Sequence, residues 1–158
     1  MKPNCPLPFR RNRYNSRGLW WSQSEYRETP VKVFDDSEYF ASPFELDVYR
    51  RLTEFSSIVV YRQHPLLVKD ATNVYSRITW RCDFRVEHVI YPNKFLNIEV
   101  KGFVKPEFKH TLKYLEYFSY LEYSRLILIT KRPQKIDKYI HSYTINDIAY
   151  LLENAGLR

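Results

Sequence analysis

Two short runs of strictly alternating apolar and polar side chains constrain the fold of this chain more than any other feature. The first covers residues 78–86 (ITWRCDFRV) and the second residues 96–101 (LNIEVK), and in both runs the apolar residues stand at even positions. Alternation with a period of two is typical of a β-strand with one buried face. The turn-forming stretch Tyr91-Pro92-Asn93 lies between the runs, so together they predict an antiparallel hairpin.

The register of this hairpin can be predicted by matching its apolar faces, because a shift of one residue would turn every apolar side chain to the wrong side. Placing Val86 opposite Ile98 makes the two apolar faces coincide. In that register Asp83 lies opposite Lys101 and diagonal to Glu99 on the polar face. Opposite and diagonal neighbours are close enough to share a ligand, so the sequence predicts one polar cluster of these three side chains.

Two interpretations of this cluster are open. Two neighbouring carboxylates are typical ligands of a hard divalent cation such as Mg²⁺. A lysine beside them can orient an attacking water or neutralise the charge of a phosphate transition state. Alternatively, the polar face is a ladder of cross-strand ion pairs, Asp83 with Lys101 and Glu99 with Arg85, that has no catalytic role.

Patterns on either side of the hairpin predict helices and further strands. Ser42-Pro43-Phe44-Glu45 has the form of a capping box with proline at the first helical position, so a helix starts there. Apolar runs predict strands at residues 58–63 and 126–129, and Thr144-x-x-Asp147 caps a last helix. Pro106 starts another helix, whose expected apolar stripe is Phe108, Leu112, Leu115, Tyr117, Phe118 and Leu121. The order helix, three strands, helix, strand, helix predicts an α/β domain.

The positive charge of the chain is concentrated near its N-terminus. The 158 residues carry a net charge of +7, of which residues 1–30 supply four units. This stretch is rich in proline and has no sustained period, so we expect an irregular arm over residues 1–36 ahead of a domain at residues 37–158. The arm is interpreted as a phosphate-contacting segment or, alternatively, as a solvated tail; its candidate contacts are Arg10, Arg11, Arg13 and Arg17.

The helix predicted at Pro106 carries two further groups of side chains. Three lysines recur at intervals of four residues, which places them on one helix face that could follow a phosphate backbone or simply be solvated. These are Lys105, Lys109 and Lys113. A group of tyrosines is expected at the edge of the core or in an interface; its members are Tyr114, Tyr117, Tyr120 and Tyr123.

Several classes of protein are excluded by what the chain lacks. No apolar run approaches the roughly 18 residues of a membrane-spanning helix, and the start, MKPNCPLPFRRNR, has no apolar segment of a secretory signal. Cys5 and Cys82 form neither a disulfide framework nor a metal-finger pattern. We therefore expect a basic protein of the cytoplasm (or of the host cytoplasm if the chain is viral), with no membrane partner. Its excess positive charge indicates a polyanionic partner, most often nucleic acid.

The segment Arg81-Cys82-Asp83-Phe84, followed by Ile98-Glu99-Val100-Lys101 and a helix, resembles the PD-(D/E)XK nuclease superfamily. Cys82 stands where that motif has its proline, which contributes no ligand. The resemblance covers roughly residues 38–130 and implies a restriction-endonuclease-like αβββαβ core, with a mixed sheet flanked by helices. Within the superfamily the chain looks most similar to the end-cleaving endonuclease subunits of cut-and-paste transposons and to phage head-completion nucleases.

This resemblance implies a DNA endonuclease that hydrolyses phosphodiester bonds with Mg²⁺, or Mn²⁺ as a substitute. Asp83 and Glu99 would be metal ligands, the carbonyl of Val100 a further ligand, and Lys101 would lie beside the attacking water. Glu45 matches a supporting carboxylate of the superfamily, with helix capping as the alternative. Gln63, at the end of a predicted strand, is expected to be solvated.

One chain would carry one active site, so cleavage of both DNA strands predicts a homodimer or a higher homo-oligomer. Two other functions remain open on the same fold. One is a non-catalytic module that binds nucleic acid, and the other is a phage assembly component.

Overall fold

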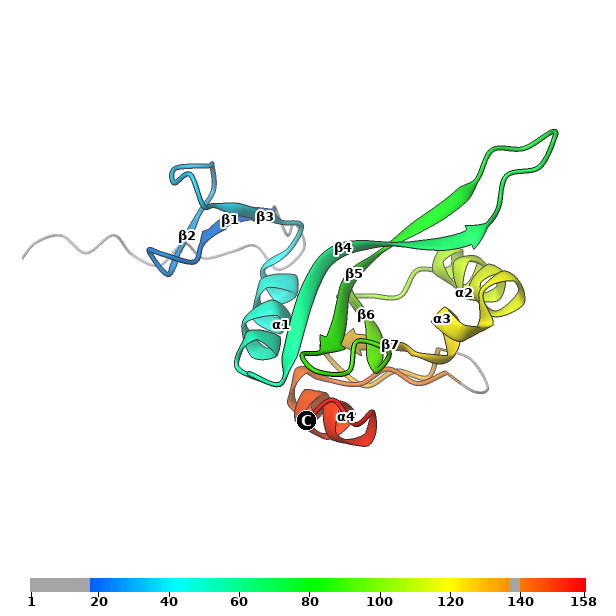
Figure 1. The fold of residues 1–158 in the computed structure, drawn as a ribbon. Coiled ribbons are helices and arrows are strands. Elements are labelled where there is room, and N and C mark those ends of the chain that lie inside the picture. The colour runs from blue at the N-terminus through cyan, green and yellow to red at the C-terminus, as the bar shows by residue number, and fades with distance from the viewer. Residues whose placement is uncertain (1–17, 137–139) are drawn as a thin grey trace, which may run out of the picture. The chain divides into compact units, whose positions relative to one another are not determined.

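The structure, a computed structural model, describes residues 18–136 and 140–158. The chain forms two compact units, Met1–Leu46 and Asp47–Arg158. The described residues form a mixed α/β protein with a three-stranded antiparallel sheet in the first unit and a four-stranded mixed sheet in the second (Figure 1).

A small sheet forms in the first unit. Its central strand β1 (Leu19–Ser22) pairs with β2 (Arg27–Thr29) on one side and β3 (Glu38–Phe40) on the other. Leu19, Trp21 and Phe40 are buried on one face. The expectation of an irregular segment is therefore wrong for residues 19–29. The four arginines of the predicted arm lie outside the described residues, and the division into an arm and a domain at residue 36 stays a prediction.

Helix α1 (Pro43–Thr53) begins where the capping box predicts. The Ser42 hydroxyl accepts the backbone N–H of Glu45 at 3.1 Å, and the Glu45 carboxylate accepts the N–H of Ala41 at 3.0 Å. The two hydrogen bonds satisfy donors that a helix start otherwise leaves unpaired. Val48 and Leu52 are fully buried along the apolar side of the helix, as their spacing predicts.

The larger sheet has the strand order β4-β5-β6-β7. Strands β4 (Ile58–Lys69), β5 (Ile78–His88) and β6 (Phe95–Lys101) form an antiparallel meander, and β7 (Leu126–Thr130) runs parallel to β6. Parallel neighbours require a crossover connection. It is provided by two helices, α2 (Pro106–Phe118) and α3 (Tyr120–Ser124), so the elements follow the predicted order with one helix divided in two.

Two short elements follow the sheet near the C-terminus. The Thr144 backbone N–H donates to Asp147 at 2.7 Å, in the predicted capping box. This box starts the short 3-10 helix η1 (Ile145–Asp147), which continues into α4 (Ile148–Asn154).

Helices cover both faces of the larger sheet. On one face, the ring of Phe84 stacks on Tyr49 of α1, with ring centres 6.0 Å apart. The next residue along β5, Arg85, contacts Glu122 of α3 at 3.3 Å. Because successive side chains of a strand point to opposite faces, α1 and α3 lie on opposite sides of the sheet. The predicted mixed sheet flanked by helices is confirmed.

Helix α2 buries a narrower stripe than predicted. Phe108, Leu112 and Leu115 are buried, and the first two pack in one cluster with Val104, Leu128 and Ile136. The expectation is wrong beyond Leu115, because Tyr117, Phe118 and Leu121 are exposed. The helix ends at Phe118 because Ser119 adopts non-helical angles (φ −144°, ψ 56°), and its hydroxyl bonds to the Leu67 carbonyl of β4.

Strands β5 and β6 pair two residues away from the predicted register. Phe84 lies opposite Ile98 rather than Val100. The backbone N–H of His88 bonds to the carbonyl of Lys94 at 3.0 Å, so the connecting turn is two residues shorter than the predicted register requires. A shift of two residues leaves every side chain on its predicted face, which is why face matching could not detect it.

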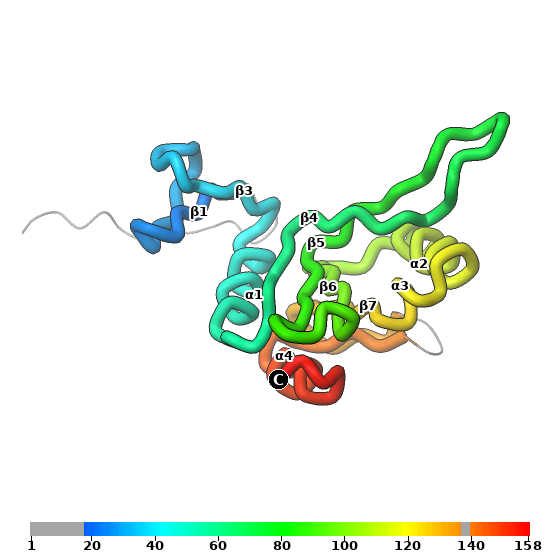
Figure 2. Tube along the Cα trace, viewed as in Figure 1, coloured from blue at the N-terminus to red at the C-terminus, as the bar shows by residue number. Residues whose placement is uncertain are grey.

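Strand β4 continues six residues beyond its predicted end at Gln63. Pro65 lacks a backbone N–H, but β4 is the edge strand of the sheet, where a missing donor is tolerated. The β4–β5 hairpin consequently reaches well past the end of β6 (Figures 1 and 2).

Candidate active site

The backbone ladder between β5 and β6 ends just before the predicted polar cluster. Its last pair is Phe84 with Ile98. Beyond it, the Asp83 N–H donates to Glu99 Oε2 at 3.2 Å, and the Val100 N–H donates to Asp83 Oδ2 at 2.8 Å. Two carboxylates thus take the place of backbone carbonyls as acceptors, and this draws both acidic side chains into the gap between the strands.

Lys101 completes the cluster from the same strand as Glu99. Residues two apart on a strand point to the same side, and the Lys101 ammonium forms an ion pair with Glu99 Oε1. The ammonium also lies 5.2 Å from the ring centre of Phe108. The Glu99 side chain is 2 % exposed and the Lys101 side chain 32 %, so the lysine forms the solvent side of the cluster. The structure therefore brings together the three residues that the sequence predicts.

Burial makes the two carboxylates of the cluster costly to ionise. Burial, and after it the charge of Asp83, raises the pKa of Glu99 from 4.5 to about 7. Burial also raises the pKa of Asp83, against the hydrogen bond from Val100 that lowers it. For Lys101, burial acts to lower the pKa, but the Glu99 carboxylate outweighs it and the pKa is raised. The cluster therefore contains two carboxyl groups whose pKa values are raised and one ammonium that stays protonated beside them.

Gln63 reaches the cluster from β4. The pairs on either side of it, Arg62 with Phe84 and His64 with Cys82, place it across from Asp83. Its Nε2 donates to Asp83 Oδ1 at 3.4 Å. Its φ of 49° lies in the left-handed region, which glutamine rarely adopts. Gln63 is exposed, as expected, but its contact with the site was missed, because no sequence pattern marks this backbone conformation.

The carbonyl of Val100 faces the same side as Asp83. In a strand, the N–H and C=O of one residue point to the same neighbouring strand. The Val100 N–H bonds to Asp83 on β5, and the carbonyl of Ile98, two residues earlier, accepts the Cys82 thiol of β5 at 3.0 Å. The Val100 carbonyl is therefore directed toward β5, as a further ligand at this cluster requires.

The predicted ladder of structural ion pairs does not form. Arg85 contacts Glu87 at 2.7 Å and Glu122 at 3.3 Å instead of Glu99. Opposite it stands Asn97, whose amide donates to Glu122 at 2.6 Å. The sequence did not indicate this polar network, because Glu122 comes from a helix far along the chain. Because Arg85 is engaged in this network, the contacts of the Glu99 carboxylate are the Asp83 backbone N–H and the Lys101 ammonium.

The remaining predicted site residues that the structure describes are Glu45 and three lysines. Glu45 belongs to the first unit, where it is buried at the start of α1, and its role as a further carboxylate stays a prediction. Three lysines are exposed, and within the described part of the chain none forms an ion pair; they are Lys105, which directly precedes α2, and Lys109 and Lys113 of α2. Their contact with phosphates stays a prediction.

Oxygen donors at the cluster are two carboxylates and one carbonyl. Within residues 18–136 and 140–158, no group of three or more His, Cys, Asp and Glu side chains is placed to hold a metal ion.

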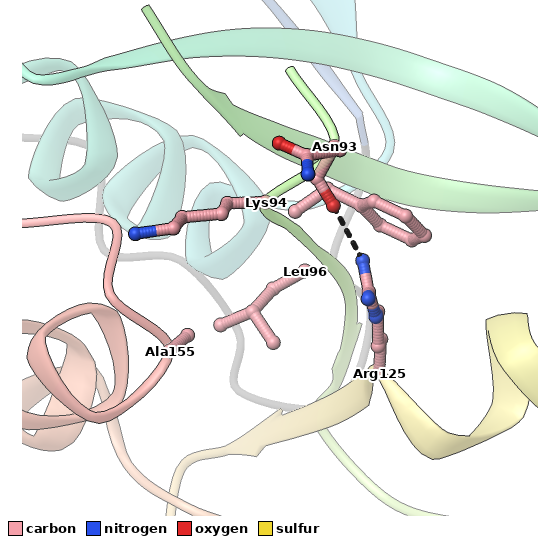
Figure 3. Close-up of a pocket in the computed structure, with 6 residues that line it drawn as sticks. Asn93, Lys94, Leu96, Arg125 and Ala155 are labelled. Atoms are coloured by element: carbon pink, nitrogen blue, oxygen red, sulfur yellow. Dashed lines mark hydrogen bonds between the residues drawn. The ribbon is translucent and has the colours of Figure 1, made fainter. Parts of the chain in front are cut away.

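A pocket of about 300 Å³ opens at the opposite end of β6 (Figure 3). Arg125 donates to the Asn93 carbonyl there at 2.7 Å, and no acidic side chain lines the pocket, so it is separate from the cluster.

No protein-family model matches this sequence, and no curated protein matches it. Among the described residues, the helices are all too short or too polar to span a membrane.

Proposed function

We propose that this protein is a metal-dependent DNA endonuclease that hydrolyses phosphodiester bonds at the cluster of Asp83, Glu99 and Lys101. The observation that carries the proposal is the Glu99 carboxylate, which is 2 % exposed and contacts both the Asp83 backbone and the Lys101 ammonium. Burying a carboxylate beside a second one costs stability, and hydrophobic residues would fill the same space at least as favourably. A function of the cluster is the simplest reason for keeping it.

The proposed fold is the restriction-endonuclease-like αβββαβ core. Its support is the element order from α1 to β7, the parallel pairing of β6 with β7, and helices on both faces of the sheet. In this arrangement the reactive side chains stand where β5 and β6 part.

The oxygen donors of the cluster fit a hard divalent cation such as Mg²⁺, for which Mn²⁺ can substitute. Mg²⁺ is usually held by one or two carboxylates, with water and substrate phosphate as the other ligands. Asp83 and Glu99 would supply the carboxylates and Val100 the carbonyl. When bound, such an ion would polarise the phosphate and provide a more acidic water.

Lys101 is proposed to stabilise the charge that develops on the phosphate. Its ammonium has three donors and a partly exposed position, so it can keep its contact with Glu99 while donating to a phosphate oxygen or to the attacking water. Asp83 is held in place from two sides, by the Val100 N–H on one carboxylate oxygen and by Gln63 on the other.

DNA is the proposed substrate because of the distribution of charge. The chain carries a net charge of +7, and the lysines at the start of α2 and within it are exposed without an ion pair among the described residues. Such cations bind the phosphate backbone by releasing its counterions. The arginines of the N-terminal segment belong to the same proposal.

Incubation of supercoiled plasmid with the purified protein tests this function. We expect nicking with Mg²⁺ or Mn²⁺ and none with a chelator. Asp83→Ala, Glu99→Ala and Lys101→Ala should each lose cleavage and still bind DNA, whereas Glu153→Ala, an exposed position on α4, should cleave like the wild type. Because the variants are purified in the same way, they also exclude a contaminating nuclease.

The proposed activity also has a clear contrary result. A wild-type protein that binds DNA but cleaves no duplex, flap, junction or supercoiled substrate with either metal would refute the enzyme and leave a non-catalytic binding module.

A further inference from the structure

Five large apolar side chains are exposed side by side where α2 ends and α3 begins. The exposed fractions are 58 % for Tyr114, 82 % for Tyr117, 41 % for Phe118, 67 % for Tyr120 and 58 % for Leu121. Tyr114 stacks on Phe118 with ring centres 6.3 Å apart, and Tyr117 meets Phe118 edge-on at 4.8 Å. These five residues are named the α2–α3 aromatic surface.

The fold of the second unit has no room for this surface in its core. The buried face of α2 is already formed by Phe108, Leu112 and Leu115. The break at Ser119, whose hydroxyl donates to the carbonyl of Leu67, starts α3 in a new direction, and none of the residues of α3 is buried. A contiguous exposed apolar patch on a protein generally marks a site of interaction.

We propose that the α2–α3 aromatic surface is the contact between two copies of this chain in a homodimer. The first reason is its charge. From Tyr114 to Leu121 the chain has one charged residue, Glu116, and a cation from β4, Lys69, lies with its ammonium 5.0 Å from the ring centre of Phe118. The centre of a protein interface is rich in aromatic rings and poor in charge, and its rim is polar. A row of rings with one acidic and one basic side chain at its edge has this composition.

The second reason is its size. The exposed fractions of the four aromatic residues add up to about two and a half whole side chains. At about 200 Å² for each aromatic side chain, the exposed area of the rings is roughly 500 Å². A specific protein interface buries about 800 Å² on each partner. The rings thus cover the central part of such an interface, and Leu121 and the neighbouring polar side chains supply the remainder.

The third reason is that the rim is complementary to itself. Glu116 and Lys69 flank the rings, the lysine with its ammonium 5.0 Å from the ring centre of Phe118, and neither forms an ion pair within the described residues. In a two-fold interface each contact between two positions occurs twice with the partners exchanged. A surface that carries both charges beside an apolar centre can therefore pair with a second copy of itself. This inference holds whether or not the protein cleaves DNA.

Sedimentation equilibrium over a series of protein concentrations tests the inference. We expect the wild type to dimerise. Tyr117→Glu and Tyr120→Glu should each weaken the dimer about thirty-fold or more, the effect of losing one interface hot spot. Tyr150→Glu, at a tyrosine of α4 that is 62 % exposed, should leave the dissociation constant unchanged. Circular dichroism and thermal unfolding verify that each variant is folded, and two separate positions keep the test valid if one variant fails to fold.

Three results would overturn the inference. The first is a wild type that is monomeric at every concentration, and the second is a pair of folded variants that dimerise like the wild type. The third is a loss of DNA affinity in these variants with no change of mass, which would identify the surface as a nucleic-acid contact.

Discussion

The variant Glu99→Gln is expected to remove most of the pH dependence of stability between about pH 4.5 and pH 7. Burial raises the pKa of Glu99 from 4.5 to about 7. Across this window the folded chain keeps a proton that the unfolded chain releases. The contribution to the free energy of unfolding is therefore complete below pH 4.5 and is lost as the pH rises through 7.

The size of this effect follows from the same pKa. One pKa unit corresponds to about 1.4 kcal/mol, so the rise from 4.5 to about 7 corresponds to about 3 kcal/mol of the free energy of unfolding. Solvent screens little of it, because the Glu99 side chain is 2 % exposed. Burial raises the pKa of Asp83 as well, which acts in the same direction.

Urea unfolding in the presence of a chelator, followed by circular dichroism at successive pH values, measures this contribution. The wild type should lose about 3 kcal/mol between about pH 4.5 and pH 8. Glu99→Gln, which has no proton to lose, should change little and should be the more stable protein at about pH 8. Glu153→Gln, at an exposed position, serves as a control that should follow the wild type. Adding Mg²⁺ at the higher pH should restabilise the wild type by mass action but not Glu99→Gln.

Two results would contradict a buried, protonated Glu99. One is a parallel loss of stability in the wild type and in Glu99→Gln over this pH range. The other is a Glu99→Gln protein that is less stable than the wild type at about pH 8. Either result would mean that Glu99 is not a buried acid that resists ionisation.

Three further predictions concern the surroundings of the site. Gln63→Val should lower the free energy of unfolding by about 1–2 kcal/mol, because a β-branched residue tolerates a positive φ poorly; thermal unfolding should show no such loss for Gln63→Gly. Glu122→Ala should cost about 1–2 kcal/mol in urea unfolding, because it leaves the Asn97 amide without this acceptor while Arg85 keeps Glu87, and a smaller loss for Glu122→Ala than for Glu122→Gln would contradict this. Replacing Lys105, Lys109 and Lys113 by alanine should lower the slope of log DNA affinity against log salt by about 0.9 per lysine, and an unchanged slope would show that they contact no phosphate.

The central hairpin shows how far the sequence could predict the structure. Alternation predicts β5 and β6 to within two residues at each end, because one face of each strand is apolar. The register was wrong by two residues, because it depends on the turn that closes between His88 and Lys94. The prediction that Asp83 and Glu99 lie together survives this error, since a two-residue shift keeps both side chains on the same face.

Features that depend on distant contacts could not be predicted. Helical periodicity placed Tyr117 and Leu121 on the buried stripe of one helix that starts at Pro106. The break between the helices is set at Ser119 by a bond to β4, which no local pattern reveals. The strands β1 to β3 are three or four residues long, too short for alternation to show. The contact of Gln63 with Asp83 depends on a left-handed backbone that the sequence does not mark.

Direct binding of Mn²⁺, followed by the electron paramagnetic resonance signal of the free ion, tests most directly whether Asp83 and Glu99 form a metal site. The wild type is expected to bind the ion, and Asp83→Asn and Glu99→Gln should each weaken binding strongly. Lys101→Ala should bind at least as well as the wild type, because it removes an ammonium that competes for Glu99, and yet it should cleave no DNA. A wild type that binds no Mn²⁺, or binding that persists unchanged in both carboxylate variants, would contradict the proposed metal site.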